Sequence, residues 1–142
     1  MSSTTSIDTN VLLLLWTQDP AWNLSASVAI QEASKRGRLC ICGPVFSELM
    51  GLPGRDAKQL KLLIEASGFH IEWDMNEVIW QTAGLAYQGY VRRRKKSGGG
   101  LPRRILTDLL IGAHASARGY SLLTMDQDFY GPAFPKLNIV SV

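Results

Sequence analysis

Cysteine and histidine are scarce in this chain of 142 residues, which holds two of each. No cluster of these residues has the spacing of a zinc site, which excludes a zinc-dependent fold. The two cysteines, Cys40 and Cys42, lie in the apolar run RLCIC. If this run is a strand, they point to opposite faces and cannot form a disulfide with each other. Unpaired buried cysteines are typical of a reducing compartment, and we expect a cytoplasmic protein.

Long hydrophobic runs are also missing. The run VLLLLW is too short to span a membrane and no basic segment precedes it, so we expect neither a membrane anchor nor a signal peptide. There is no phosphate-binding glycine loop, because the run SGGG follows no strand. Hydrophobic residues make up 46% of the chain and charged residues 19%. These values and the length predict one globular domain, residues 1–142, with a sizeable core.

Acidic residues are absent from one long segment, between Glu77 and Asp108. Residues 92–104 within it hold seven of the fifteen Lys and Arg residues. The seven are Arg92, Arg93, Arg94, Lys95, Lys96, Arg103 and Arg104. Such a stretch is either a solvated helix end enriched in cations or a contact surface for a polyanion. We favour the polyanion, because the stretch leads directly to Asp108.

The hydrophobic pattern predicts strands that alternate with helices. Apolar or alternating runs predict a strand that ends at Asp8 and further strands at 38–42, 69–73, 121–125 and 138–142. Helical spacing and end signals predict helices at 10–17, 21–36, 44–50, 55–67, 76–96 and 107–118, the last of them capped by Thr107. Residues 97–104 predict a flexible loop. The order of elements indicates an α/β fold, with a central parallel β-sheet flanked by α-helices.

Four carboxylates stand in otherwise apolar surroundings. Asp8 and Asp126 end strands, Glu48 follows a strand, and Asp108 opens a helix. In an open parallel sheet, strand carboxyl ends and helix amino ends share one edge, so we expect all four acids at one rim. Two carboxylates 4 Å apart repel each other by about 4 kcal/mol at an effective dielectric constant of 20. Mg²⁺ or Mn²⁺ would remove that repulsion, activate a water and stabilise charge on a phosphodiester.

Each acid also has an ordinary structural explanation. Asp8 and Asp126 suit turns, Asp108 suits the positive end of a helix, and Glu48 suits a solvated helix position. These explanations weaken when the four are taken together, because each acid is flanked by core-like residues on the same predicted rim.

The segments around these acids resemble PIN-domain ribonucleases, specifically the VapC-type toxins of bacterial toxin–antitoxin pairs. They are IDTNVL with Asp8, FSEL with Glu48, ILTDLLIGAHA with Asp108 and LLTMDQDF with Asp126, in the family's order over residues 7–129. The resemblance implies a compact α/β fold and Mg²⁺- or Mn²⁺-dependent endonucleolytic cleavage of RNA by an activated water. It also implies a homodimer and inhibition by a cognate antitoxin whose peptide occupies the acidic groove.

Motif positions in the family imply roles for individual residues. The catalytic metal ligands would be Asp8, Glu48, Asp108 and Asp126. Thr124 would orient a ligand or a water, and Asn10 would bond a neighbouring carboxylate. Asp128 either binds metal through a water or caps the turn at Phe129, and we favour the cap. The basic stretch would contact the RNA backbone, which supplies affinity but little sequence information.

Two rival functions fit parts of the pattern. A phosphatase of the haloacid dehalogenase type also has an aspartate nucleophile at the end of its first strand. It needs a second acid two residues later, where this chain has Asn10. A non-enzymatic RNA-binding domain on the same fold usually lacks some of the acids, and all four are present here.

Histidines and tryptophans have simpler interpretations. His114 lies six residues after Asp108, about 600° further round the helix, so we expect a core histidine that points away from Asp108. His70 should face solvent from an alternating strand. The tryptophans should be core or interface residues, and Trp16 and Trp22 are candidates for a dimer contact. The other two are Trp73 and Trp80.

Overall fold

Parallel strands form the centre of the molecule. The computed structural model describes residues 3–99 and 106–142. Within these residues, five strands pair in parallel in the order β3-β2-β1-β4-β5. They are β1 (Thr5–Ile7), β2 (Leu39–Cys42), β3 (Phe69–Glu72), β4 (Ser121–Thr124) and β5 (Asn138–Ser141). The predicted α/β fold with a central parallel sheet is confirmed.

The strand order creates a topological switch point between β1 and β4. The chain builds β1, β2 and β3 outward on one side, then continues with β4 and β5 on the other side of β1. Ile7 of β1 pairs with Leu123 of β4, so the next residues, Asp8 and Thr124, emerge side by side. Ligands of open α/β sheets bind at the carboxyl ends of the strands, at such a point.

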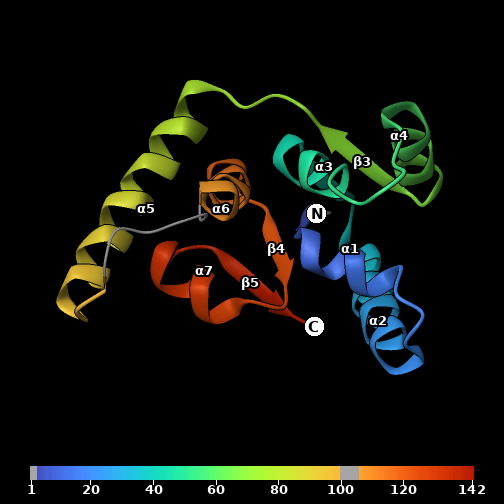
Figure 1. Ribbon diagram of the computed structural model, residues 1–142, viewed down its shortest axis with the longest axis horizontal. Coiled ribbons are helices and arrows are strands. Elements are labelled where there is room, and N and C mark those ends of the chain that lie inside the picture. Colours follow the sequence, from blue (N-terminus) through green and yellow to red (C-terminus); the bar gives the residue numbers. More distant parts are fainter. Residues whose placement is uncertain (1–2, 100–105) are drawn as a thin grey trace.

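Helices connect the strands and cover the sheet (Figure 1). In chain order they are α1 (Thr9–Leu15), α2 (Pro20–Arg36), α3 (Gly43–Leu49), α4 (Ala57–Ala66), α5 (Glu77–Lys96), α6 (Leu106–Arg118) and α7 (Gln127–Ala133). The six predicted helices are present, with ends shifted by two residues or fewer. Asp19, Asp56 and Asn76 cap α2, α4 and α5 by accepting hydrogen bonds from backbone N–H groups. These caps explain where the three helices begin.

Three details near helix starts differ from the predictions. Helix α7 is not among the predicted elements, because it contains Gly131 and Pro132, which disfavour helix formation. Asp128 is the second residue of α7 and therefore does not cap it; Asp126 holds the cap position instead. Thr107 likewise lies inside α6 and is not its cap. Part of the predicted loop, residues 100–105, lies outside the described residues.

The core is built from strand and helix side chains together. Ile7, Ile41 and Leu122 of the strands are fully buried. Helix α6 passes so close to Phe134 that a Cβ atom at Gly112 would lie 2.3 Å from the phenylalanine ring. The tryptophans are predicted to be core or interface residues, and Trp16 packs against this core. Three of them are about half exposed, namely Trp22, Trp73 and Trp80, and Trp16 is partly buried.

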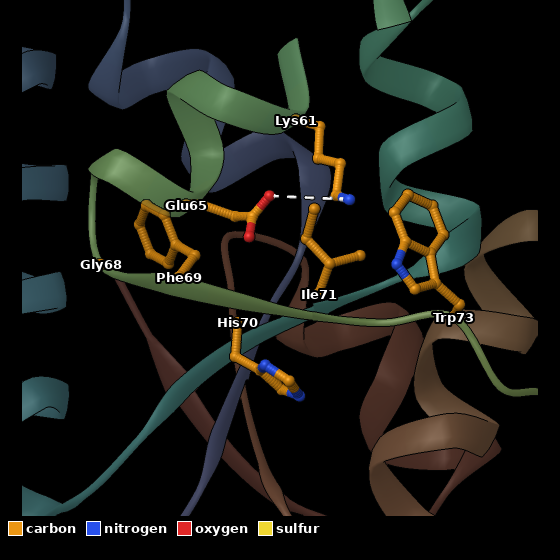
Figure 2. Close-up of a pocket in the computed structure, with 7 residues that line it drawn as sticks. All are labelled: Lys61, Glu65, Gly68, Phe69, His70, Ile71 and Trp73. Carbon is orange, nitrogen blue, oxygen red and sulfur yellow. Dashed lines mark ion pairs between the residues drawn. The ribbon is translucent and has the colours of Figure 1, made fainter. Parts of the chain in front are cut away.

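Strand β3 forms one edge of the sheet and shows the predicted alternation. Phe69 and Ile71 are buried, whereas His70 is exposed and lies on the opposite side of the strand (Figure 2). A hollow of about 530 Å³ lies along this edge. Its lining consists of Lys61, Glu65, Gly68, Phe69, His70, Ile71 and Trp73. None of the four predicted site acids lines it, so this hollow is separate from the predicted site.

Cysteine chemistry follows the prediction. Cys40 and Cys42 are both buried and neither forms a disulfide. Burial raises the pKa of each thiol to about 12.

Among residues 3–99 and 106–142, no helix is both long enough and apolar enough to cross a membrane.

Candidate active site

Asp8 is the most buried of the four predicted acids, with 3% of its surface exposed. It follows β1 and caps α1, where its Oδ1 accepts a hydrogen bond from the backbone N–H of Thr9 at 2.8 Å. Its Oδ2 accepts one from the Thr124 hydroxyl, also at 2.8 Å. The Thr124 oxygen in turn accepts the backbone N–H of Asp126 at 2.9 Å. Burial raises the pKa of Asp8, and these hydrogen bonds oppose the rise.

Glu48 reaches the same place from α3. It lies in the last turn of that helix with its side chain exposed, and its Oε1 accepts a hydrogen bond from the Thr9 hydroxyl at 2.6 Å. Thr9 therefore touches both acids, Asp8 through its backbone and Glu48 through its side chain. Thr9 is not among the predicted site residues, because adjacency to Asp8 is its only signal in the sequence.

The electrostatics of Asp108 link it to the other three acids. It lies in the first turn of α6 and is partly buried. Burial, and then the negative charges of Asp8, Glu48 and Asp126, raise its pKa to about 6. A carboxylate at a helix N-terminus is ordinarily stabilised as an anion. Because the pKa of Asp108 is raised, burial and repulsion by the other acids must have a larger effect on it than the positive end of the helix. This is expected of an acid on a shared acidic rim.

Asp126 has no capping role that would explain its carboxylate. It occupies the N-cap position of α7, but its side chain makes no cap hydrogen bond. The backbone carbonyl of Asp126 accepts the first N–H groups of the helix instead, from Phe129 at 3.2 Å and from Tyr130 at 3.3 Å. The Asp126 side chain is exposed, and its charge contributes to raising the pKa of Asp108.

The donor set of this rim suits a hard divalent cation. The four acids offer only oxygen ligands, which Mg²⁺ and Mn²⁺ prefer. In the described part of the chain, no group of three or more His, Cys, Asp or Glu side chains is arranged to enclose a metal ion. Mg²⁺ does not require such a cage, because it usually keeps several waters and binds one or two carboxylates directly. The repulsion at Asp108 and the oxygen-only donors fit a cation that keeps much of its hydration.

A buried hydroxyl on α7 also faces the acids. Tyr130 is fully buried and lies one helical turn after Asp126. Burial and the charges of Asp8, Asp108 and Glu48 raise the pKa of its hydroxyl strongly. The hydroxyl acts as a hydrogen-bond donor towards Asp8 and lowers the pKa of that carboxyl, although the two groups are not in ideal hydrogen-bond geometry. Tyr130 is not among the predicted site residues, because the helix that presents it is not predicted.

Asn10 connects α1 to the segment after β4. Its Oδ1 accepts the backbone N–H of Met125 at 3.3 Å, so this oxygen bonds the segment that follows β4. Asn10 thereby ties the start of α1 to the segment between Thr124 and Asp126. An amide used in this way provides no second acid for the rival phosphatase chemistry.

The basic stretch lies on the last turns of α5. Its exposed members are Arg92, Arg93, Lys95 and Lys96. Arg94 is partly buried, with its Nη1 3.5 Å from the Tyr90 hydroxyl. Tyr90 contacts Phe129 of α7, with ring centroids 6.0 Å apart, and Phe129 is three residues after Asp126. The end of α5 thus approaches the acidic rim through α7. Arg103 and Arg104 lie outside the described residues.

A second charged cluster joins α6 to β3. The Glu72 carboxylate lies 2.9 Å from Nε2 of His114 and accepts the Tyr120 hydroxyl at 2.6 Å, while Arg118 is 3.7 Å away. Although burial raises it, the hydrogen bonds from Tyr120 and His114 hold the pKa of Glu72 below its usual value. His114 is fully buried, so the predicted core histidine is confirmed. The cluster anchors the helix that carries Asp108.

Comparisons with known proteins agree with this architecture. Similar solved structures include VapBC2 from Rickettsia felis bound to a promoter DNA fragment, with 20% identity, 98% of each chain covered and a TM-score of 0.65. VapBC-1 from nontypeable Haemophilus influenzae has 20% identity, 97% of each chain covered and a TM-score of 0.66. A toxin–antitoxin complex from Klebsiella pneumoniae has 17% identity, with 96% of this chain and 95% of that chain covered and a TM-score of 0.57. No curated protein matches the chain.

At these identities the solved structures establish the fold alone. The sequence itself matches the PIN domain family model over residues 6–135, a span that includes all four acids, Thr124 and Tyr130. The chain belongs to the PIN domain family.

Proposed function

We propose that this chain is a divalent-metal-dependent endoribonuclease, the toxin of a toxin–antitoxin pair. PIN-domain nucleases generally need a divalent metal ion, which supports the reaction class. One observation carries the proposal: burial and the charges of Asp8, Glu48 and Asp126 raise the pKa of Asp108 to about 6. The action of three other acids on Asp108 supports a common site at the switch point of the sheet. The acids repel one another, and a metal ion that promotes hydrolysis of a phosphodiester would offset this repulsion.

The proposed ligands of Mg²⁺ or Mn²⁺ are Asp8, Glu48, Asp108 and Asp126. When bound, the cation supplies the positive charge that activates water and stabilises charge on the phosphodiester. Thr124 holds Asp8, and Thr9 holds both Asp8 and Glu48, so the carboxylates are oriented before the substrate arrives. Asp108 must be ionised to bind a cation, so cation binding should release its proton at pH values near and below 6.

The proposed substrate contact is the basic end of α5. Its exposed cations are Arg92, Arg93, Lys95 and Lys96, and the Tyr90–Phe129 contact brings this end of the helix towards Asp126. Phosphate contacts from these side chains would hold an RNA strand beside the acids and contribute affinity without reading its sequence. We propose the same contact with the RNA backbone for Arg103 and Arg104.

The proposed partners are a cognate antitoxin and a second copy of this chain. The Klebsiella pneumoniae structure is a toxin–antitoxin complex, which supports the first partner. A basic side chain of the antitoxin would complement the four carboxylates and compete with the cation. Exposed apolar side chains on α2, Trp22 at 50% and Leu24 at 64%, suit a contact between two copies.

Cleavage of single-stranded RNA by the purified protein tests the activity. We expect cleavage with Mg²⁺ or Mn²⁺ and none in EDTA. Asp126→Asn should reduce the rate by about 100-fold or more, because several kcal/mol of metal-dependent stabilisation is lost. Glu77→Gln is the matched control, since Glu77 is an exposed acid in the first turn of α5 and should be dispensable. Sequencing the cut ends after brief induction in cells would then identify the RNA.

Two other results would contradict the proposal. Metal-independent RNA binding without cleavage would indicate a binding domain. A covalent aspartyl-phosphate on Asp8 would indicate phosphatase chemistry, which neither the family match nor the position of Asn10 favours.

A further inference from the structure

The side chain of Thr9 joins two of the helices that carry the acidic site. Thr9 is the first residue of α1 and is buried, with 7% of its surface exposed. Its hydroxyl donates to Oε1 of Glu48 in α3 at 2.6 Å, across 39 positions of the chain. Its backbone N–H donates separately to Oδ1 of Asp8 at 2.8 Å. The two contacts come from different groups, so a substitution that removes the hydroxyl alone leaves the contact with Asp8 in place.

The place of Thr9 in its helix leaves the hydroxyl free to bond another element. A threonine inside a helix commonly donates its hydroxyl to the backbone carbonyl one turn earlier. Thr82 does so in α5, where its hydroxyl donates to the carbonyl of Val78 at 2.7 Å. Thr9 opens α1, so no carbonyl of that helix precedes it by one turn. Its hydroxyl is therefore available to a side chain that comes from α3.

Glu48 depends on this contact for its orientation. It is exposed in the last turn of α3, and the bond from Thr9 is the only hydrogen bond that its carboxylate makes with a described residue. A glutamate side chain that is not held samples many rotamers, and ordering it costs free energy. The bond to Oε1 reduces that cost before a cation arrives, and Oε2 has no donor among the described residues.

We propose that Thr9 is a positioning residue, whose hydroxyl orients Glu48 so that Oε2 is the oxygen offered to the divalent cation. This inference rests on the proposed function, because it requires Glu48 to be a cation ligand. It makes cation affinity depend on a hydroxyl that is not itself a ligand. Asp8 does not need this hydroxyl, because it is almost fully buried and its two oxygens accept hydrogen bonds from the Thr9 N–H and from Thr124.

Thr9→Val tests the inference, with Thr82→Val as the matched control. Both variants replace a hydroxyl with a methyl group, but the Thr82 hydroxyl bonds only its own helix. Thermal melts of the purified full chain would be recorded without metal and across a Mg²⁺ titration. Thr9→Val should need about 3- to 10-fold more Mg²⁺ for half-maximal stabilisation, which corresponds to the loss of one hydrogen bond. Thr9→Ser keeps the hydroxyl and should restore the midpoint, and Thr82→Val should not change it.

Two further measurements separate positioning from a structural role. Without metal, Thr9→Val should melt within about 4 °C of the wild type, because water replaces the lost donor at the exposed Glu48 carboxylate. In a Glu48→Ala background the hydroxyl has no carboxylate to hold, so Thr9→Val should not shift the Mg²⁺ midpoint further. A Glu48→Ala protein that no longer responds to Mg²⁺ would also support the inference, because Glu48 is then indispensable to the cation.

Three results would overturn the inference. They are an unchanged Mg²⁺ midpoint in Thr9→Val, a midpoint that Thr9→Ser does not restore, and an equal shift by Thr9→Val with and without Glu48. In each of these cases a wild type that responds to Mg²⁺ and cleaves RNA leaves the proposed function standing. A wild type that does neither would overturn the proposed function and this inference together.

Discussion

Replacing Asp108 with asparagine should stabilise the metal-free protein at neutral pH, although it removes an acid from the start of a helix. Burial and the charges of Asp8, Glu48 and Asp126 raise the pKa of Asp108 from 3.8 to about 6. A raised carboxyl pKa means that the folded state disfavours the ionised form, so ionised Asp108 lowers stability above pH 6. This cost fades as the pH falls from about 6 towards 3.8, where the carboxyl becomes protonated in both states.

The size of the effect follows from the usual and the raised pKa of Asp108. The two values, 3.8 and about 6, differ by about 2. One pKa unit corresponds to about 1.36 kcal/mol, so the upper bound on the effect is about 3 kcal/mol. Asp108 is only partly buried, and solvent screens part of the repulsion, so we expect about 1–2 kcal/mol. At about 2–4 °C per kcal/mol for a chain of this size, the melting temperature should rise by several degrees.

Urea unfolding of the metal-free proteins measures this effect. Asp108→Asn should be more stable than the wild type near neutral pH, and the difference should shrink as the pH approaches about 4. Glu77→Gln serves as the control, because Glu77 is an exposed acid in the first turn of α5. Its loss should cost about 0.3–1 kcal/mol, the worth of an anion at a helix N-terminus. Mg²⁺ should then stabilise the wild type by mass action and Asp108→Asn much less.

The opposite sign would refute the reasoning. If Asp108→Asn is less stable than the wild type at neutral pH, as Glu77→Gln should be, then Asp108 merely complements the dipole of α6. Equal stabilisation of the wild type and Asp108→Asn by Mg²⁺ would also remove Asp108 from the cation site.

Two further perturbations test the surroundings of the site. Replacing Arg92 and Arg93 with alanine should weaken RNA binding and reduce the slope of log affinity against log salt by about 0.7 per lost phosphate contact. An unchanged slope in binding titrations at several salt concentrations would mean that these residues form only a solvated helix end. Glu72→Gln should lower the free energy of unfolding by about 1–3 kcal/mol at neutral pH, because His114 and Tyr120 lose a charged acceptor in a partly buried cluster. The pKa of Glu72 is lowered in the folded state, so its contribution to stability is complete above its usual pKa of 4.5. That contribution is lost as the pH falls through the pKa of Glu72 in the folded state. If the stability difference between Glu72→Gln and the wild type in urea unfolding does not change with pH, this reasoning is wrong.

The sequence by itself determined the five strands and six of the described helices. Apolar runs at 38–42 and 121–125 indicate strands buried on both faces, because this signal depends only on neighbouring residues. The acids at the ends of these elements could be predicted to share a rim, because every strand of a parallel sheet presents its carboxyl end to the same edge. Asp8 and Asp108 needed nothing beyond that order of elements to be assigned to one site.

Only the tertiary structure decided what those acids touch. Strand β4 pairs with β1, so Thr124 bonds Asp8 across 116 positions of the chain, and no local period records that pairing. Helix α7 forms despite Gly131 and Pro132, because tertiary packing of its buried face overrides weak local propensity. That helix brings Tyr130 to the acids. The pKa of Asp108 likewise belongs to the fold, since burial and charges from three other segments set it.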